Sequence, residues 1–345
     1  MRRSTLFPYL AAFLGLVACL LLFVLVIVIP GLKRELLPAA TPTSDLSATL
    51  NALPSPTATF IPVPTSSPTP AGPTGKIAYV CQVAHDQICL MNADGSQKRR
   101  LTTEDGIRHF YPSLAPDGKS VVYSAYREDN VYEIYEMILD DGQVTPLTDR
   151  LGVLTAPEIS PDGRLIVFTR WTPDSDAHAI WVMKRDGSDP RQVFGPPQGE
   201  GWDPTWSPDG TQILFASDMD GFVQLYVIGL DGSGLRKVTQ MNGLRGRSDW
   251  SPDGEYIVTY AGEPWLRELF LMRADGSDAH QITPTGGNSQ GPSFSPDGRW
   301  VAFTAYFDHF GDVNGCEIYI MRTNGADLTR LTDNAYCDWQ PRWGP

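Results

Sequence analysis

The pentapeptide Trp-Ser-Pro-Asp-Gly occupies residues 206–210 and returns unchanged at residues 250–254. Near-copies with the same Pro-Asp-Gly ending stand at 114–118, 159–163 and 294–298. Measured between their last glycines, the five copies are spaced by 45, 47, 44 and 44 residues. A turn that recurs at a nearly constant interval indicates a chain built from one structural unit used several times.

Each unit carries the same parts in the same order. In the copy that begins at Trp206, an apolar stretch at 213–215 follows the turn, and a polar loop leads to a second apolar stretch at 225–228. A tight Asp-Gly turn and a stretch ending in Val238-Thr239 complete the copy. Asp-Gly is a strong hairpin signal because these residues tolerate positive φ. Four short antiparallel strands in about 45 residues are typical of a β-propeller blade.

The two ends of the repeated region complement each other. Residues 75–115 form a copy that lacks its own first strand, whereas residues 340–345 match residues 203–208 and then stop. The sequence therefore predicts an all-β fold, a six-bladed β-propeller over residues 75–345 that is closed by the C-terminal strand. Such closure removes the exposed sheet edges that promote aggregation.

The N-terminal region has a different character. Residues 10–29 form an uncharged apolar run of 20, which as a helix is about 30 Å long, the thickness of the hydrocarbon layer of a membrane. We therefore expect residues 1–37 to form a membrane anchor with one transmembrane helix. A bacterial lipobox at 16–19 is the competing interpretation, in which Cys19 carries a lipid. Both interpretations attach the protein to a membrane.

Residues 38–74 are rich in proline, serine and threonine and have no helical period. Such a segment buries too little apolar surface to offset the entropy of ordering it, so we expect a disordered, extended linker. Linkers of this kind are typical of exported proteins. The prediction is a single-pass cell-membrane protein with its propeller on the extracytoplasmic side. The net charge of −13 argues against nucleic acid as a partner.

The repeated pattern P-x-W-S-P-D-G-x-x-I-x-F, followed by I-Y-x-M, D-G and L-T, resembles the TolB-type six-bladed propeller family. It is also similar to the propeller of prolyl-oligopeptidase and dipeptidyl-peptidase proteins. The resemblance covers about 270 residues and implies the fold, but propellers host many unrelated activities. TolB proteins carry an α/β domain where this chain has the predicted anchor and linker, and no segment remains for the hydrolase domain of the peptidases.

Function is expected in the loops that do not repeat, because variable loops on a rigid scaffold commonly form binding sites. These loops share the face opposite the Pro-Asp-Gly turns. The residues that enter the innermost strands there should ring the mouth of the central channel and suit a peptide or sugar ligand. They are His109, Phe110, Tyr111, Thr155, Trp202, Asp203, Arg247, Gln290, Trp339 and Gln340. The alternative is that the aromatic residues only pack blade against blade.

Acidic and nucleophilic residues elsewhere have simpler explanations. The turn aspartates should each bind the backbone amides of their own turn. They are Asp117, Asp162, Asp209, Asp253 and Asp297. Residues 287–291 match G-x-S-x-G, but no helix follows to form the strained turn that this motif needs, so we interpret the match as chance. We expect no metal site, no cofactor and no catalytic residue.

Four cysteines belong to the repeated region. Three pairings are possible, and we favour Cys81 with Cys89 and Cys316 with Cys337; four free thiols would instead indicate the cytoplasm. The sequence thus predicts a non-catalytic module at the cell envelope that binds a protein, peptide or glycan. The alternatives are a hydrolase or lyase that acts on peptide or glycan at the channel mouth, and a purely structural envelope protein.

Overall fold

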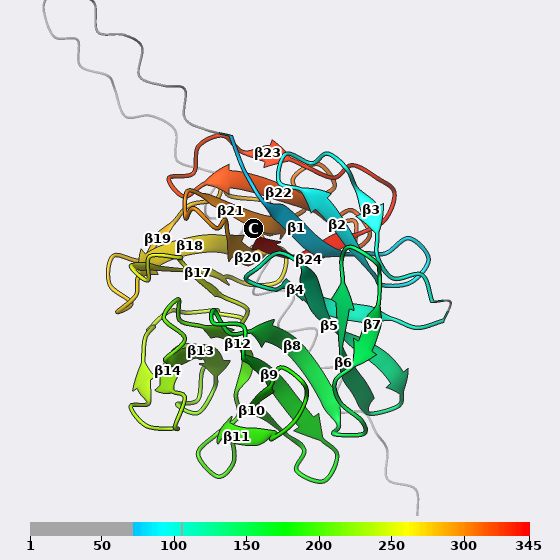
Figure 1. Cartoon of the computed structure of the whole chain (residues 1–345). Coiled ribbons are helices and arrows are strands. Elements are labelled where there is room, and N and C mark those ends of the chain that lie inside the picture. The colour runs from blue at the N-terminus through cyan, green and yellow to red at the C-terminus, as the bar shows by residue number, and fades with distance from the viewer. Residues whose placement is uncertain (1–71, 105) are drawn as a thin grey trace, which may run out of the picture. The chain divides into compact units, whose positions relative to one another are not determined.

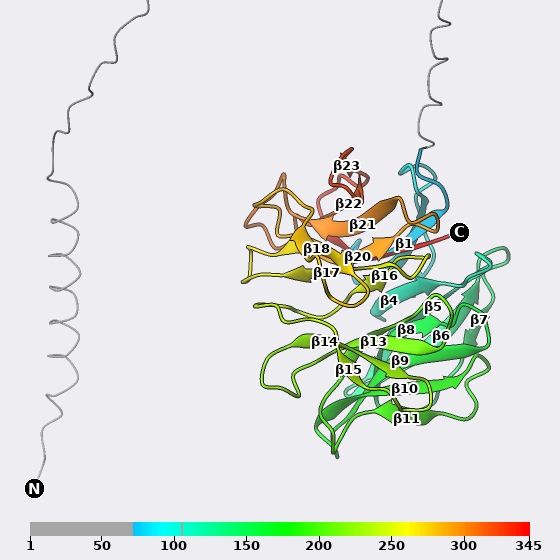
Figure 2. The same ribbon diagram turned by 90° about the vertical axis from the view of Figure 1, so that its left-hand side faces the viewer.

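The computed structural model describes residues 72–104 and 106–345, which contain twenty-four strands arranged as six four-stranded antiparallel blades. Figure 1 views the propeller down its central channel, with the innermost strands around the centre and the outermost strands at the rim. Figure 2 shows the same ring from the side. The all-β propeller predicted from the repeats is therefore confirmed.

The blades are numbered from the N-terminus, and each has four strands from the channel outward. The innermost strands, for blades 1 to 6, are β24 (Asp338–Gly344), β4 (His109–Leu114), β8 (Val153–Ile159), β12 (Trp202–Trp206), β16 (Asp249–Trp250) and β20 (Gln290–Phe294). The second strands are β1 (Lys76–Cys81), β5 (Ser120–Glu128), β9 (Leu165–Thr172), β13 (Gln212–Ser217), β17 (Tyr256–Ala261) and β21 (Trp300–Ala305).

The two outer positions complete each blade. The third strands are β2 (Gln87–Asn92), β6 (Val131–Ile138), β10 (Ala177–Lys184), β14 (Gln224–Gly229), β18 (Glu268–Arg273) and β22 (Glu317–Arg322). The outermost strands are β3 (Arg99–Arg100), β7 (Val144–Pro146), β11 (Arg191–Phe194), β15 (Arg236–Lys237), β19 (His280–Gln281) and β23 (Thr329–Arg330). A single parallel bridge between Tyr132 and Val153 also joins blades 2 and 3.

The last strand of the chain closes the ring. β24 pairs antiparallel with β1, with Lys76 opposite Gly344 and Cys81 opposite Asp338. Blade 1 thus consists of three strands from the start of the propeller and one from its end. This is the closure that the truncated copy at 340–345 predicts.

Six apolar clusters lie between the blades, one at each of the six interfaces. Alternate residues of a middle strand face opposite neighbours, as the pleat requires. In β1, for example, Ile77 and Tyr79 pack against blade 6, whereas Ala78 and Val80 pack against blade 2. The middle strands are apolar on both faces because each blade is covered on both sides.

The repeated turn is held by its own side chains. In each of the five turns, the aspartate accepts a hydrogen bond from the backbone amide two residues later, at 3.0 to 3.1 Å. In four turns a serine two positions before the aspartate also donates to it, at 2.6 Å. Each aspartate thus binds the backbone of its own turn, which is the contact expected for it from the sequence.

The repeated Leu-Thr ending has an equally local cause. In five blades its threonine hydroxyl donates to a glutamate or glutamine at the start of the third strand and accepts from the next backbone amide, as Thr102 does with Gln87 and Ile88. The equivalent pairs are Thr148–Glu133, Thr239–Gln224, Thr283–Glu268 and Thr332–Glu317. This contact, the Thr clamp, ties the outer edge of each of these blades to its third strand.

Both predicted disulfides are present. Cys81 in β1 is bonded to Cys89 in β2, within blade 1. Cys316, immediately before β22, is bonded to Cys337, immediately before β24. The second bond therefore links blade 6 covalently to the strand that completes blade 1.

The predicted membrane span at 10–29, the lipidation alternative at Cys19 and the linker as far as residue 71 lie outside the described residues. Within residues 72–104 and 106–345, no helix has the length and apolar character needed to cross a membrane.

Replacing Cys316 and Cys337 together by alanine should lower the free energy of unfolding by about 3 kcal/mol, since the bond closes a loop of 21 residues. Urea unfolding of the full chain measures this loss. Trypsin should also cleave faster after Arg342, which lies in β24.

The matched control replaces Cys81 and Cys89, whose bond stays inside one blade. That variant should lose stability without faster cleavage after Arg342. Equal cleavage rates in the two variants would show that the Cys316–Cys337 bond does not hold the closing strand.

Candidate functional site

The innermost strands share an irregularity near their start. The register between the innermost and second strands shifts at this point in blades 2, 3, 4 and 6, and in β1 opposite β24. Each shift contains a residue with positive φ, namely Tyr111, Ala156, Asp203, Gly291 and Gln340, at 51° to 58°. Bulges of this kind redirect side chains and are frequent next to binding sites.

These five positions and Arg247, which aligns with them in blade 5, form the bulge ring around one end of the channel. Two residues later along each strand, side chains return to the channel because successive residues of a strand alternate in direction. This second set, the inner ring, consists of Ser113, Glu158, Thr205, Asp249, Ser293 and Arg342.

Arg342 fills the centre of the inner ring. Its guanidinium forms an ion pair with Glu158 across the channel and lies 3.0 Å from Asp249 Oδ1. Thr205 donates to Glu158 at 2.9 Å, and Ser293 donates to Asp249 at 3.0 Å. Burial raises the pKa of Glu158, and the positive charge of Arg342 opposes that rise. The cluster thus joins four blades through a strand that belongs to a fifth.

A pocket of about 210 Å³ lies on the bulge-ring side, at the end of the channel where the innermost strands begin. We call it the mouth pocket. It is lined by Tyr111, Asp203, Arg247, Tyr260, Gln290, Gly291, Thr304, Tyr306, Cys337, Trp339 and Gln340. Aromatic rings and hydrogen-bonding groups therefore meet in one hollow on a rigid scaffold.

Two opposite charges are buried in this pocket. Arg247 is 7% exposed, and burial lowers the pKa of its guanidinium to about 10, so the group stays protonated at neutral pH. Its guanidinium lies 5.5 Å from the centre of the Tyr111 ring. Burial raises the pKa of Asp203, although the charge of Arg247 and a hydrogen bond from the Arg247 amide act against this.

Six of the ten residues predicted at the channel mouth line the mouth pocket. They are Tyr111, Asp203, Arg247, Gln290, Trp339 and Gln340. Five of them lie at or directly before the bulge in their strand, and the sixth, Arg247, aligns with the bulge positions. The side-chain oxygen of Gln340 accepts a hydrogen bond from the Tyr111 amide at 2.9 Å. Gln340 thereby connects blade 1 to blade 2 across the ring.

The other four predicted residues do not line the pocket. His109 is 2% exposed and packs edge-on against Tyr123, and burial lowers the pKa of its imidazole to about 4. Phe110 stacks on Tyr132 in its own blade. The Phe110 ring also lies 6.2 Å from that of Trp339 in blade 1, which is the blade-against-blade packing of the alternative, whereas His109 packs inside its own blade.

Thr155 and Trp202 also point elsewhere. Thr155 lies opposite Thr169 in the β8–β9 ladder. Trp202 packs in the cluster between blades 4 and 5, with its ring centre 6.3 Å from that of His178.

Five lining residues were not predicted at the channel mouth. Gly291 and Cys337 come from the entrance of innermost strands, and the sequence analysis assigned Cys337 to a disulfide. Tyr260 and Thr304 come from second strands, and Tyr306 follows β21 directly. The sequence signal for them was weak, because the positions aligned with Tyr260 and Thr304 also hold the polar residues Ser124 and Thr169 in other blades.

The opposite end of the channel has its own hollow, of about 320 Å³. Its rim is formed by the proline of every turn, Pro116, Pro161, Pro208, Pro252, Pro296 and Pro345. The carboxylates of Glu158 and Asp249 at its floor are occupied by the Arg342 cluster. The sequence analysis predicted no site at this end, although the rim could have been predicted from the six prolines that share one aligned position.

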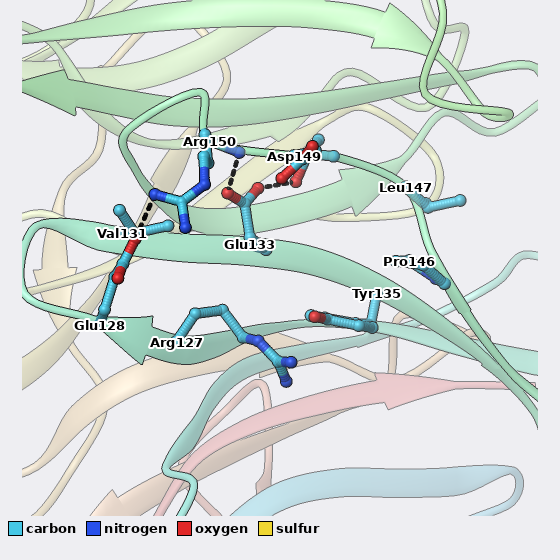
Figure 3. Close-up of a pocket in the computed structure, with 10 residues that line it drawn as sticks. Arg127, Glu128, Val131, Glu133, Tyr135, Pro146, Leu147, Asp149 and Arg150 are labelled. Atoms are coloured by element: carbon cyan, nitrogen blue, oxygen red, sulfur yellow. Dashed lines mark hydrogen bonds and ion pairs between the residues drawn. The ribbon is translucent and has the colours of Figure 1, made fainter.

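A groove of about 680 Å³ at the outer edge of blade 2 is larger still, and Figure 3 shows its lining. Its charged groups are largely paired with one another. Arg150 binds Glu128 at 2.5 Å, and Glu133 accepts from Thr148 and from the Arg150 amide. Glu133 is the acceptor of the Thr clamp in blade 2, and four other blades have the same clamp. We therefore attribute this groove to the way a blade is built and do not assign a site to it.

Within the part of the chain that the structure describes, no three His, Cys, Asp or Glu side chains gather as a metal site. The serine of the G-x-S-x-G match, Ser289, is fully buried, and its backbone amide is bound to the Arg267 carbonyl at 2.7 Å. This geometry does not present Ser289 as a nucleophile.

The model of the TolB beta propeller domain matches residues 74–309, about two thirds of the chain. The chain belongs to this family. An uncharacterized protein from Agrobacterium fabrum is 30% identical over 185 residues, which are 51% of this chain and 61% of the relative. A Tol-Pal system protein TolB from Anaeromyxobacter dehalogenans is 31% identical over 156 residues, 44% of this chain and 35% of the relative.

Solved structures share the fold. TolB from Acinetobacter baumannii matches with a TM-score of 0.68 at 24% identity, over 79% of this chain and 67% of that one. A putative TolB from Agrobacterium tumefaciens matches with a TM-score of 0.62 at 21% identity, over 80% and 100%. The TolB-type resemblance predicted from the repeats is confirmed, and the chain spans less than two thirds of both curated relatives.

Replacing Arg342 by methionine should lower the free energy of unfolding by about 3–5 kcal/mol, because it leaves two buried carboxylates without their cation. Chemical denaturation measures the loss. Combining this change with Glu158→Gln and Asp249→Asn removes both charges and should restore most of the stability. A triple variant as unstable as the single one would show that packing, and not charge, is what Arg342 contributes.

Proposed function

We propose that this TolB-type propeller is a binding module that takes a protein, peptide or glycan at the mouth pocket and performs no chemistry on it. The observation that carries the proposal is the pocket itself. Tyrosine and tryptophan rings, one arginine and one aspartate converge there on backbone positions that are fixed by bulges and packed blades. Binding sites commonly combine apolar walls with a few fixed polar groups in this way.

The proposed setting is the cell envelope. The apolar run at 10–29 would anchor the chain in the membrane, and the linker at 38–74 would hold the propeller on the extracytoplasmic side. The disulfides Cys81–Cys89 and Cys316–Cys337 support an oxidising compartment, since structural disulfides are rare in the cytoplasm. One relative is a Tol-Pal system protein TolB, and membership of such a system is consistent with a role in binding other proteins.

The direct test presents peptide and glycan panels to the immobilised full-length chain and assays both retained ligand and released products. Trp339→Ala and Tyr306→Ala remove two aromatic walls of the mouth pocket. Each should weaken binding at least tenfold, as buried aromatic anchors commonly do. No panel member should be converted to product.

Phe222→Ala is the matched control, because Phe222 is an exposed aromatic residue on a loop of blade 4, outside the mouth pocket. It should leave binding unchanged. Product formation that Asp203→Ala abolishes would replace the proposal by the hydrolase or lyase alternative. Binding that survives both pocket variants would move the site elsewhere on the propeller.

The compartment has a separate test. Non-reducing mass spectrometry of the protein taken from its native cells should find peptides joined as Cys81–Cys89 and Cys316–Cys337. Four free thiols would contradict the extracytoplasmic placement.

A further inference from the structure

The mouth pocket contains more hydrogen-bond donors than its own acceptors satisfy. Arg247 Nη1, Trp339 Nε1 and Thr304 Oγ1 are all buried, line the pocket and have no hydrogen-bond partner in the protein. Two of the three are donors only, and the hydroxyl can donate as well. Buried polar groups without partners are costly, so a pocket that keeps several of them is built to receive acceptors.

The two side-chain amide oxygens in the pocket are already occupied. Gln290 Oε1 accepts from Arg267 Nη1 at 2.7 Å, and Gln340 Oε1 accepts from the Tyr111 amide at 2.9 Å. The Asp203 carboxylate faces the Arg247 amide. The imbalance therefore points in one direction, toward a ligand group that accepts hydrogen bonds.

The charges around the pocket favour an anion of low valence. Arg247 is the one basic residue that lines it and Asp203 the one acidic residue, while Arg267 and Arg342 lie directly behind the lining. Burial raises the pKa of Asp203, and the charge and the backbone amide of Arg247 oppose that rise. A guanidinium can donate two parallel hydrogen bonds to the two oxygens of a planar carboxylate, which the ammonium group of a lysine cannot do.

Size limits the ligand further. A volume of about 210 Å³ is below the range of about 300–1,000 Å³ that is typical of drug-sized ligands. The pocket therefore accommodates one amino-acid residue or one sugar ring. The rings of Tyr111, Tyr260, Tyr306 and Trp339 supply the apolar walls for the body of such a group.

We infer that the mouth pocket binds a carboxylate carried on a residue-sized group, with Arg247, Trp339 Nε1 and Thr304 Oγ1 as its donors. The inference rests on the proposed function, because it names the ligand chemistry of the same pocket. A carboxylate of this kind has two sources, an acidic peptide residue and a uronic acid, and the experiment distinguishes them.

The experiment titrates the full-length chain with paired probes that differ at the carboxylate, followed by calorimetry and ligand-observed NMR. N-acetylglutamate N-methylamide is compared with N-acetylglutamine N-methylamide, so that the side-chain carboxylate is the charge by which the two probes differ, and galacturonate is compared with galactose. In at least one pair the acid should bind at least tenfold tighter than the neutral partner. The pair that shows the preference identifies the peptide or the sugar source.

Arg247→Gln should abolish that preference. Arg273→Gln, a matched change at a half-exposed arginine in the same blade, should leave it intact. Since Arg247→Gln removes a buried group and could unfold the chain, Trp339→Phe and Thr304→Val provide milder tests. Each removes one donor while keeping the pocket wall, and each should weaken the acid about three- to tenfold and leave the neutral probe unchanged.

Several results would overturn the inference. One is equal binding of the acid and neutral probes, and another is a preference that persists in Arg247→Gln. A third is the absence of binding of either acid at 50 mM, since a ligand of about ten non-hydrogen atoms should bind well below this concentration. Inorganic phosphate that binds through Arg247 while both acids do not would also overturn it. Equal binding of acid and neutral probes that is still lost in Tyr306→Ala would refute the carboxylate and leave the proposed function standing.

Discussion

The pairing of β24 with β1 is the contact on which the rest of the structure depends. It converts a row of five complete blades and one incomplete blade into a ring, and every other feature of the channel requires that ring. The strand adds Trp343 to the apolar cluster between blades 6 and 1. The same strand brings Arg342 to the centre of the channel and Trp339 and Gln340 to the mouth pocket. A disulfide at the residue directly before β24 then fixes the closure.

Closure also divides the channel into two unlike ends. The Arg342 cluster occupies the inner ring, where the arginine is ion-paired with two carboxylates and each carboxylate also accepts from a hydroxyl group. Beyond it on one side lies an apolar rim of prolines, and on the other a pocket with unpaired donors. The two ends thus offer different chemistry although the same six strands form both. The difference arises because the bulge ring and the inner ring, two residues apart in each innermost strand, carry different side chains.

Repetition made most of the fold predictable. Six copies of one pattern identified the blade and the turn, because each is stabilised by contacts within a few dozen residues. The closing strand was identified because its truncated copy matches the strand that the first copy lacks. The turn aspartates and both disulfides followed from the same local reasoning. The Thr clamp was visible as a repeated Leu-Thr, but its partner at the start of the third strand was not recognised, since Gln87 and Glu133 differ in type. Blade 3 has Ala179 at that position and manages without the clamp.

The site was less predictable for a physical reason. A residue at the entrance of an innermost strand faces the channel or the neighbouring blade according to where the bulge falls, and one residue of displacement reverses its direction. His109 and Tyr111 are two residues apart in one strand, yet the register shift between them sends one into the core and the other into the pocket. Tyr306 enters from the segment directly after a second strand, which no repeat of the innermost strand could reveal.

A ring that closes on its final strand imposes an order on its own formation. β1 is synthesised near the start of the propeller, but the strand that covers its inner edge begins about 260 residues later. If the chain is synthesised at about 5–20 residues per second, the backbone groups of that edge stay unpaired for tens of seconds. During this interval the nascent chain exposes the kind of edge on which another chain could add a strand. The arrival of β24 therefore determines whether blade 1 pairs with its own chain or with another chain.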